Sequence, residues 1–214
     1  MIKTEKELQA NYEKFITICK KYMSGERLER VLHMYSPDEL GPNLIVAPAS
    51  GNLGYHNCYP GGYIDHIFNV CRNSIKVKNM FIDMGGTPDF TDEELIFCAL
   101  HHDLGKLGSK GLPNYIENDS DWHIKNKGEC YKRNENLVYM TITHRTFFTL
   151  QSYGIKISEA EYFGIKLTDG MYDDDNQKYL RTYDLKKRMP FKMHRILHWA
   201  DHMSTVIESE ENTI

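Results

Sequence analysis

An imidazole and a carboxylate occupy adjacent positions, His102 and Asp103, close behind the apolar run 95–100. Ionisable groups that follow such a run are expensive to bury unless each finds a partner. Two adjacent ligands at the end of a helix can hold one metal ion from a single rigid point. Together with His66 upstream and Asp201 downstream, they would complete a site for metal-assisted hydrolysis.

The types of ligand narrow the choice of ion. Hard divalent ions prefer oxygen ligands, whereas imidazoles favour Mn, Fe, Co, Ni or Zn. Two histidines with two aspartates therefore favour one of these metals, with Mg²⁺ still possible. Four protein ligands leave two positions of an octahedron for water and a phosphate oxygen. We expect one divalent metal ion as the cofactor.

The elements that must position these residues are predicted to be helices, because apolar residues recur near helical spacing along most of the chain. Thr91 with Glu94, and Ser158 with Glu161, form capping boxes that mark helix starts. The run after Thr91 is apolar almost all round, as in a buried central helix. Helices are expected at about 5–35 (two helices, broken at Ser24-Gly25), 64–83, 91–103, 136–153, from 158 onward and at 190–208.

Two long segments between the helices are predicted to be functional loops. Residues 36–62 are rich in Pro, Gly and Asn, and irregular stretches of this length are usually functional. Residues 108–133 are polar, and we interpret them as a loop or lid in which Trp122 helps to select the substrate. Because alternating strand patterns are nearly absent, we expect an all-α helical bundle with long loops and at most a short hairpin.

Length and charge limit the class of protein. The 214 residues are predicted to form one domain, with N-terminal helices in 1–45 packed on a core of 46–208. Lysine and arginine number 26 against 30 acidic residues, giving a net charge of −4. An acidic surface disfavours extended duplex nucleic acid, whereas a small nucleotide or a single chain end can still bind at a metal and a few lysines.

The cysteines and the N-terminus bear on localisation. Five widely spaced cysteines without a CxxC pair indicate neither a disulfide framework nor a zinc knuckle. The N-terminus lacks the apolar stretch of a secretory signal, and no segment approaches the roughly 20 apolar residues that span a bilayer. We expect a cytoplasmic protein without a membrane partner.

The four candidate ligands resemble the metal site of the HD-domain superfamily of metal-dependent phosphohydrolases. That pattern is a first histidine, an adjacent His-Asp pair and a distant aspartate on a later helix, here His66, His102 with Asp103, and Asp201. The string HDLGK is common in the superfamily, and HWADHMS is similar to its closing helix. The likeness covers about residues 47–208, and it implies an all-α core, as periodicity also predicts.

Two further strings narrow the resemblance. APAS at 47–50 and PGGYIDH at 60–66 are similar to bacterial HD-type 3′-to-5′ exoribonucleases and to small nucleotide hydrolases of bacteria and phages. Dinuclear members of the superfamily add two histidines, and His144 matches the first. At the second position this chain has Thr168 followed by Asp169. This departure speaks against a second tightly held metal, although Asp169 could ligate one directly or through water.

The resemblance also suggests roles around the metal. Asp103 is both a ligand and a catalytic residue, and Lys106 is expected to place its ammonium on a phosphate oxygen; the alternative for Lys106 is a charge that complements a helix dipole. His144 would orient the phosphate or donate a proton to the leaving oxygen, a task that suits an imidazole. Substrate binding is expected from His56, Lys106 and Asp169.

Three histidines repeat every four residues on the last predicted helix, namely His194, His198 and His202. We interpret them as flanking a helix whose ligand is Asp201, and not as ligands themselves.

The sequence therefore predicts a metal-dependent phosphohydrolase that cleaves a phosphate ester or anhydride of a nucleotide through a metal-activated water. One alternative is a 3′-to-5′ exonuclease on single-stranded RNA or DNA ends, which would need a basic track that is not obvious in the sequence. The other is a non-catalytic sensor that keeps the metal site to bind a nucleotide. A homo-oligomer is possible, since related domains often pair.

Overall fold

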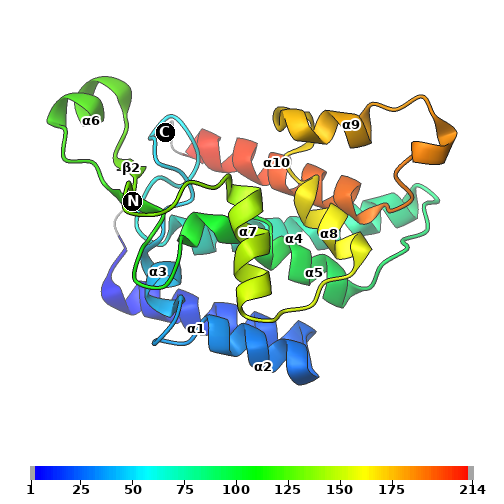
Figure 1. The fold of residues 1–214 in the computed structure, drawn as a ribbon, viewed down its shortest axis with the longest axis horizontal. Helices are drawn as coiled ribbons and strands as arrows, with labels where there is room; N and C mark the ends of the chain where they lie inside the picture. The colour runs from blue at the N-terminus through cyan, green and yellow to red at the C-terminus, as the bar shows by residue number, and fades with distance from the viewer. Residues whose placement is uncertain (1–2, 212–214) are drawn as a thin grey trace.

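The computed structural model describes residues 3–211, and within them the chain forms ten α-helices, four 3₁₀ helices and one hairpin (Figure 1). The α-helices are α1 (Glu5–Tyr22), α2 (Gly25–Met34), α3 (Gly41–Val46), α4 (Gly62–Asp83), α5 (Asp92–His101), α6 (Asp121–Lys127), α7 (Ile142–Ser152), α8 (Glu159–Lys166), α9 (Gln177–Leu180) and α10 (Met193–Glu211). The 3₁₀ helices are η1 (Leu104–Leu107), η2 (Gly170–Tyr172), η3 (Asp174–Asn176) and η4 (Leu185–Lys187), and the strands are β1 (Tyr115–Glu117) and β2 (Tyr131–Arg133), paired antiparallel. The all-α prediction is confirmed.

Helix starts follow the predicted caps. The hydroxyl of Thr91 accepts from the backbone N–H of Glu94, whose carboxylate accepts from the N–H of Thr91. Ser158 and Glu161 form the same reciprocal pair. Each box satisfies backbone donors that the first helical turn leaves without partners, so it fixes where α5 and α8 begin.

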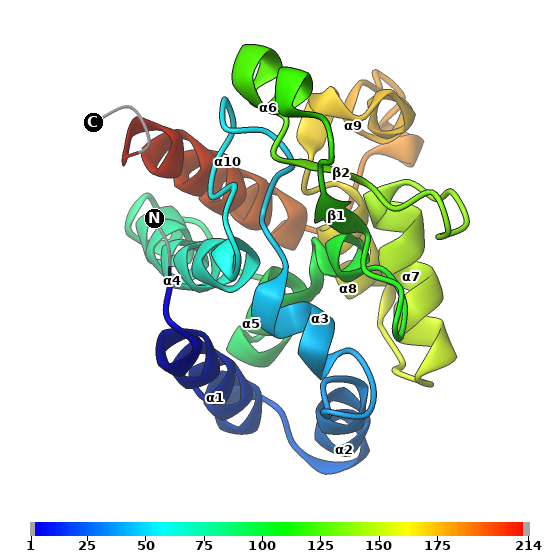
Figure 2. The ribbon, with the colours of Figure 1, turned by 90° about the vertical axis from the view of Figure 1, so that its left-hand side faces the viewer.

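Helix α4 lies at the centre of the bundle, with α1 on one side and α10 on the other (Figures 1 and 2). Helix α5 is buried from Leu95 to His101, which agrees with its nearly continuous apolar run. One hydrophobic cluster joins Phe15 of α1, Ile64 of α4, Phe97 of α5 and Leu197 of α10. Each such side chain contributes about 1.5–3 kcal/mol when fully buried. The three helices that carry the predicted ligands therefore share one core.

The first long loop is more ordered than its composition indicates. Helix α3 lies inside the stretch predicted to be irregular, with a proline in its first turn, where proline fits a helix best. The amide of Asn43 donates to the carbonyl oxygens of Leu107 and Ser109, each at 2.9 Å, and this holds the loop against η1. At Gly62 a Cβ would lie 2.1 Å from the carbonyl oxygen of Asn57. The PGG string is therefore a tight entrance into α4 that only glycine permits.

Two boundaries differ from the sequence prediction. The segment 108–133 contains the hairpin β1–β2 and helix α6, not only loop. The helix predicted from residue 136 begins at Ile142, with Thr141 accepting from the backbone of His144 as the cap. Before it, the Asn134 side chain accepts from the N–H of Asn136 and donates to a loop carbonyl. Such local side-chain bonds compete with helix formation and delay the start of α7.

Within residues 3–211, no helix is both long and apolar enough to cross a membrane. The five cysteines are all free thiols, and four of them are buried.

His194, near the start of α10, is buried and should couple folding to pH. Burial first, and then the charge of Arg195, lower its pKa to about 4. The Phe191 backbone and Asp89 oppose this in part, and His198 lowers the pKa further. In the unfolded chain the His194 imidazole takes up a proton near pH 6.5, whereas in the folded protein it does so only at about pH 4. Stability contributed at neutral pH is therefore lost as the pH falls through this window, by about 1.4 kcal/mol per pH unit.

The variant His194→Phe cannot take up this proton. Between pH 6.5 and pH 4.5 we therefore expect its unfolding free energy to fall less steeply than that of the wild type, by about 1.4 kcal/mol per pH unit. Urea unfolding at several pH values measures it. Parallel curves for the wild type and the variant would contradict the prediction.

Candidate metal centre

The four predicted ligands converge from three helices. His66 lies near the start of α4, His102 and Asp103 follow the end of α5, and Asp201 lies midway along α10. The Nε2 atom of His66 is 3.1 Å from Asp201 Oδ1 and 3.8 Å from Asp103 Oδ2. The Nε2 atom of His102 is 3.5 Å from Asp103 Oδ2 and 3.6 Å from Asp201 Oδ1. Two nitrogens and two oxygens therefore lie close together, and the ligand atoms of His66, His102 and Asp103 are all within 4.8 Å of one another.

Both imidazoles are oriented by their other ring nitrogen. His66 Nδ1 lies 3.0 Å from a carboxylate oxygen of Glu208, and His102 Nδ1 lies 2.9 Å from the carbonyl oxygen of Ala99. Because these oxygens only accept, each Nδ1 carries the hydrogen and each Nε2 presents a lone pair. Both Nε2 atoms are buried without a hydrogen-bond partner among the described residues. Two orphaned lone pairs beside two carboxylates are a donor set that fits a divalent transition metal.

The site holds negative charge in a buried place. Burial raises the pKa of Asp201, but the adjacent imidazoles of His102 and His66 outweigh it and hold that pKa well below the usual value. Burial lowers the pKa of His66, and Asp201 and Glu208 outweigh that effect and raise it to about 9. The lone pair of His66 Nε2 therefore takes up either a proton or a cation, and a metal ion that binds there displaces the proton. The Asp201 carboxylate therefore stays ionised and attracts positive charge to the space beside the two imidazoles.

Asp103 also reaches a lysine. Lys106 Nζ lies 2.6 Å from Asp103 Oδ2, and both side chains are only 13% exposed. Burial lowers the pKa of Lys106, but Asp103 outweighs it and raises the pKa above its ordinary value. The ammonium thus remains charged beside the metal position.

The HDLGK string has a structural reason for its glycine. The chain turns from α5 into η1, where the Gly105 N–H donates to the Thr146 hydroxyl of α7 at 2.9 Å. A Cβ on Gly105 would lie 2.1 Å from the carbonyl oxygen of Ile142. This close approach locks the His-Asp pair against α7.

A cavity of about 410 Å³ opens on this site. Its size falls within the range of small-molecule sites. His66, Asp103, Lys106 and Asp201 line it, together with His56, Ile142, Thr168, Asp169, Tyr172, His198, His202 and Thr205.

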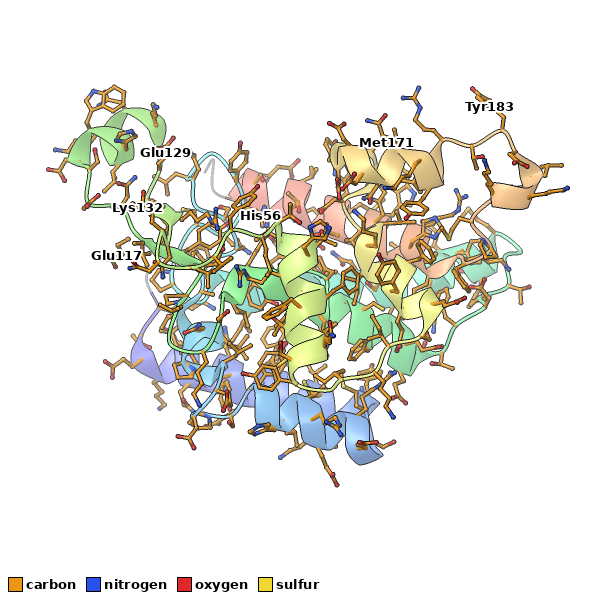
Figure 3. All side chains as sticks on the ribbon, in the orientation of Figure 1. His56, Glu117, Glu129, Lys132, Met171 and Tyr183 are labelled. Atoms are coloured by element: carbon orange, nitrogen blue, oxygen red, sulfur yellow. The ribbon has the colours of Figure 1, made fainter. Side chains whose placement is uncertain are left out.

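Two predicted substrate-binding residues belong to this cavity. The ring of His56 packs 4.6 Å from that of His66 (His56 is labelled in Figure 3), and burial, followed by the charges of His66 and Lys106, lowers its pKa to about 3. Burial, Asp103 and Asp201 raise the pKa of Asp169. His56 thus faces the cavity as a neutral imidazole, and Asp169 adds a further carboxyl group to the cavity lining.

Other predicted residues lie elsewhere. His144 is exposed on α7 and is not among the residues that line the cavity; Ile142, two positions earlier, lines it instead. Trp122 is 58% exposed on α6 and lies outside the cavity lining. His198 and His202, interpreted as flanking residues, do line the cavity.

Sequence reasoning missed Glu208. Its carboxylate is buried, accepts from His66, and also accepts from the amide of Asn69 at 2.7 Å. It follows Asp201 by seven positions, two turns of α10, and therefore points to the same side of the helix. That spacing was the available signal.

No protein-family model matches this chain, and no curated protein or solved structure matches it significantly.

Proposed function

We propose that this protein is an HD-type metal-dependent phosphohydrolase that cleaves a phosphate ester or anhydride of a nucleotide. The observation that supports this most strongly is the pair of buried, partnerless Nε2 lone pairs, His66 and His102, facing the carboxylates of Asp103 and Asp201. A structural cluster would satisfy these nitrogens with hydrogen bonds.

His66, His102, Asp103 and Asp201 would hold one divalent ion, with Mn, Fe, Co, Ni or Zn favoured and Mg possible. Such an ion lowers the pKa of water and neutralises charge on a phosphate. Asp169 lines the same cavity and is the candidate for contact with a second ion.

The chain's own residues supply the rest of the chemistry. Lys106 presents a permanent positive charge to a phosphate oxygen, which neutralises charge that develops as the bond breaks. Asp103 holds this ammonium in place at 2.6 Å. His56, kept neutral by burial, can donate or accept a single hydrogen bond to the substrate. Ile142 contributes an apolar side chain to the cavity lining.

A mononucleotide is the favoured substrate, because the cavity has the size of a small-molecule site and the chain carries a net charge of −4. The test described next also distinguishes the two alternatives, the exonuclease and the nucleotide sensor. All five cysteines are free thiols, which is typical of proteins in a reducing compartment, and we therefore propose a cytoplasmic location.

The test is a screen of nucleoside mono-, di- and triphosphates and short oligonucleotides with Mn²⁺, Co²⁺ and Mg²⁺, with phosphate release and nucleotide products as readouts. Metal-dependent hydrolysis of mononucleotides is the expected result. Hydrolysis of oligonucleotides alone would favour the exonuclease. Nucleotide binding without turnover under every metal would favour the sensor and refute the enzyme.

A further inference from the structure

A second cavity, of about 270 Å³, shares Lys106 with the cavity at the metal centre. Apolar loop residues form one wall, and the hairpin forms the other. The walls that matter here are Val46, Pro48 and Pro60 from the loop, and Tyr115, Glu117 and Tyr131 from the hairpin. Because Lys106 belongs to both cavities, a molecule with its phosphate on Lys106 can extend into the second one.

The hairpin presents three side chains to the same side. Tyr115 and Glu117 are two positions apart on β1, so they share a face of the ribbon. Tyr131 of β2 is the cross-strand partner of Glu117, which places it on that face as well. Burial, followed by the charges of Cys58 and Glu117, raises the pKa of Tyr131 to about 12, so its hydroxyl stays protonated. Figure 3 labels Glu117 on the hairpin.

We propose that this second cavity binds the nucleobase of the substrate, an inference that rests on the proposed function. Proline and tyrosine rings give flat apolar walls on which a planar heterocycle can stack. The Glu117 carboxylate only accepts hydrogen bonds, so it pairs with N–H donors of the base. An exocyclic amino group can donate to it freely, whereas the N3–H of uracil or thymine lies between two carbonyl oxygens that repel a carboxylate. The substrates are therefore nucleotides of adenine, cytosine or guanine in preference to uracil or thymine.

Binding of unphosphorylated nucleosides and of inorganic phosphate, measured separately by NMR titration of the metal-loaded protein, tests the inference without requiring turnover. We expect adenosine and cytidine to bind more tightly than uridine. Tyr131→Leu should weaken all nucleosides by about 10- to 100-fold, and Glu117→Gln should remove the preference over uridine. Phosphate binding should stay unchanged in both. Tyr139→Leu and Glu135→Gln, exposed residues outside both cavities, are the matched controls.

Nucleosides that bind neither wild type nor variants, or bind all of them equally, would overturn the subsite. If nucleosides bind as expected while no phosphorylated substrate is hydrolysed, the proposed function fails and the subsite stands. If a dinucleotide binds more tightly than either nucleoside, the pocket holds the terminal base of a nucleic-acid strand and not the base of a mononucleotide.

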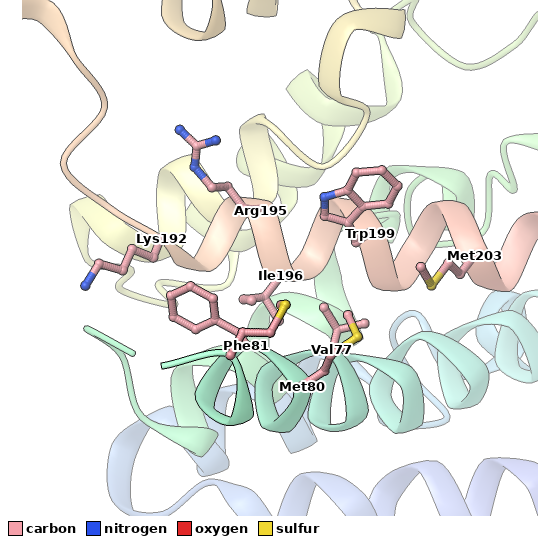
Figure 4. Close-up of a pocket in the computed structure, with 9 residues that line it drawn as sticks. Val77, Met80, Phe81, Lys192, Arg195, Ile196, Trp199 and Met203 are labelled. Carbon is pink, nitrogen blue, oxygen red and sulfur yellow. The ribbon is translucent and has the colours of Figure 1, made fainter. Parts of the chain in front are cut away.

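A separate surface lies on the outer side of α10 and concerns a partner. An apolar groove of about 440 Å³ runs between α4 and α10, with Lys192 and Arg195 at one end (Figure 4). Its apolar walls are Val77, Met80, Phe81, Ile196, Trp199 and Met203. None of its lining residues belongs to the cavity at the metal centre.

The exposed positions of α10 continue this groove as one stripe. Arg195, Trp199, Met203, Val206 and Glu210 are all exposed and recur at spacings of three or four residues. The stripe begins with a cation, is apolar in its middle and ends with an acid. In an antiparallel pair about a two-fold axis between residues 202 and 203, Arg195 would face Glu210 of the second copy. Trp199 would face Val206 by the same symmetry.

We infer that the occupant of this surface is a second copy of the same chain, because a two-fold interface must be self-complementary and this stripe is. Burying the exposed tryptophan, methionine and valine supplies the attraction. The end charges fix the antiparallel direction.

Sedimentation velocity over about 1–100 µM protein measures the association. We expect a dimer that Arg195→Glu and Glu210→Arg each weaken by at least about tenfold, since each variant opposes like charges. The double variant should restore the dimer, because both ends are exchanged. Lys76→Glu, an exposed change elsewhere on α4, is the control.

A wild type that stays monomeric, or a double variant that dimerises no better than the single variants, would overturn the inference. A monomer whose groove binds an apolar dye would assign it to another ligand.

Discussion

Replacing Asp103 by asparagine should abolish metal-dependent hydrolysis, lowering kcat/KM by about a thousandfold or more. Its Oδ2 atom lies 3.8 Å from His66 Nε2, 3.5 Å from His102 Nε2 and 2.6 Å from Lys106 Nζ. The substitution keeps the shape but removes the charge that faces the metal, and it also releases the lysine that faces the phosphate. Both effects weaken the transition state more than the ground state.

Steady-state kinetics with each metal and calorimetric titration of the metal measure the two losses separately. Asp119→Asn is the matched control, since Asp119 also pairs with a lysine, Lys132 at 2.7 Å, but lies on the exposed surface. Circular dichroism shows whether both variants fold. An Asp103→Asn protein that binds metal and turns over substrate like the control would refute the metal centre.

Three of the four candidate ligands could be predicted from the sequence because each follows an apolar segment, and His66 was added through the family resemblance. His102 and Asp103 follow a run that is buried from Leu95 onward, and Asp201 sits beside the buried Ala200. Burying such groups without partners costs free energy, so they were expected to lie close together and pair with one another. The geometry brings these residues together with His66, as predicted.

Side-chain direction on α7 could not be predicted, because it depends on where the helix begins. The pattern predicts a start near residue 136, but the Asn134 side-chain bonds hold that segment out of the helix. With Thr141 as the cap, Ile142 lines the cavity and His144 is exposed to solvent. The role predicted for His144 through its family resemblance therefore has no support from its position.

The position of the hairpin could not be predicted from the periodicity of apolar residues either. Its strands are three residues each, too short to show a repeat of two against a polar background. Yet this element supplies Tyr115, Glu117 and Tyr131 to the cavity beside Lys106. If this cavity binds the base as we propose, selectivity for the substrate resides in the part of the chain that carries the weakest sequence signal.

The second large effect is expected at Glu208, which touches the metal position only through His66. Glu208→Gln should lower metal affinity by about 10- to 100-fold, as is usual when the partner of a metal-binding histidine is lost. The glutamine can still accept from His66 Nδ1–H through its carbonyl oxygen, so the ring stays in place, while its amide nitrogen faces Asn69 and the hydrogen bond from Asn69 is lost. What disappears is the negative charge that makes the imidazole a stronger ligand.

A positioning role has a distinct kinetic signature. At saturating metal the variant should recover a kcat close to that of the wild type, because the substrate, Lys106 and the four ligands are unchanged. A merely structural role would instead lower stability and kcat together at every metal concentration. Calorimetry of metal binding beside kinetics at two metal concentrations separates the cases, with Glu135→Gln as the exposed control. Unchanged metal affinity in Glu208→Gln would mean that the 3.0 Å contact with His66 only packs α4 against α10.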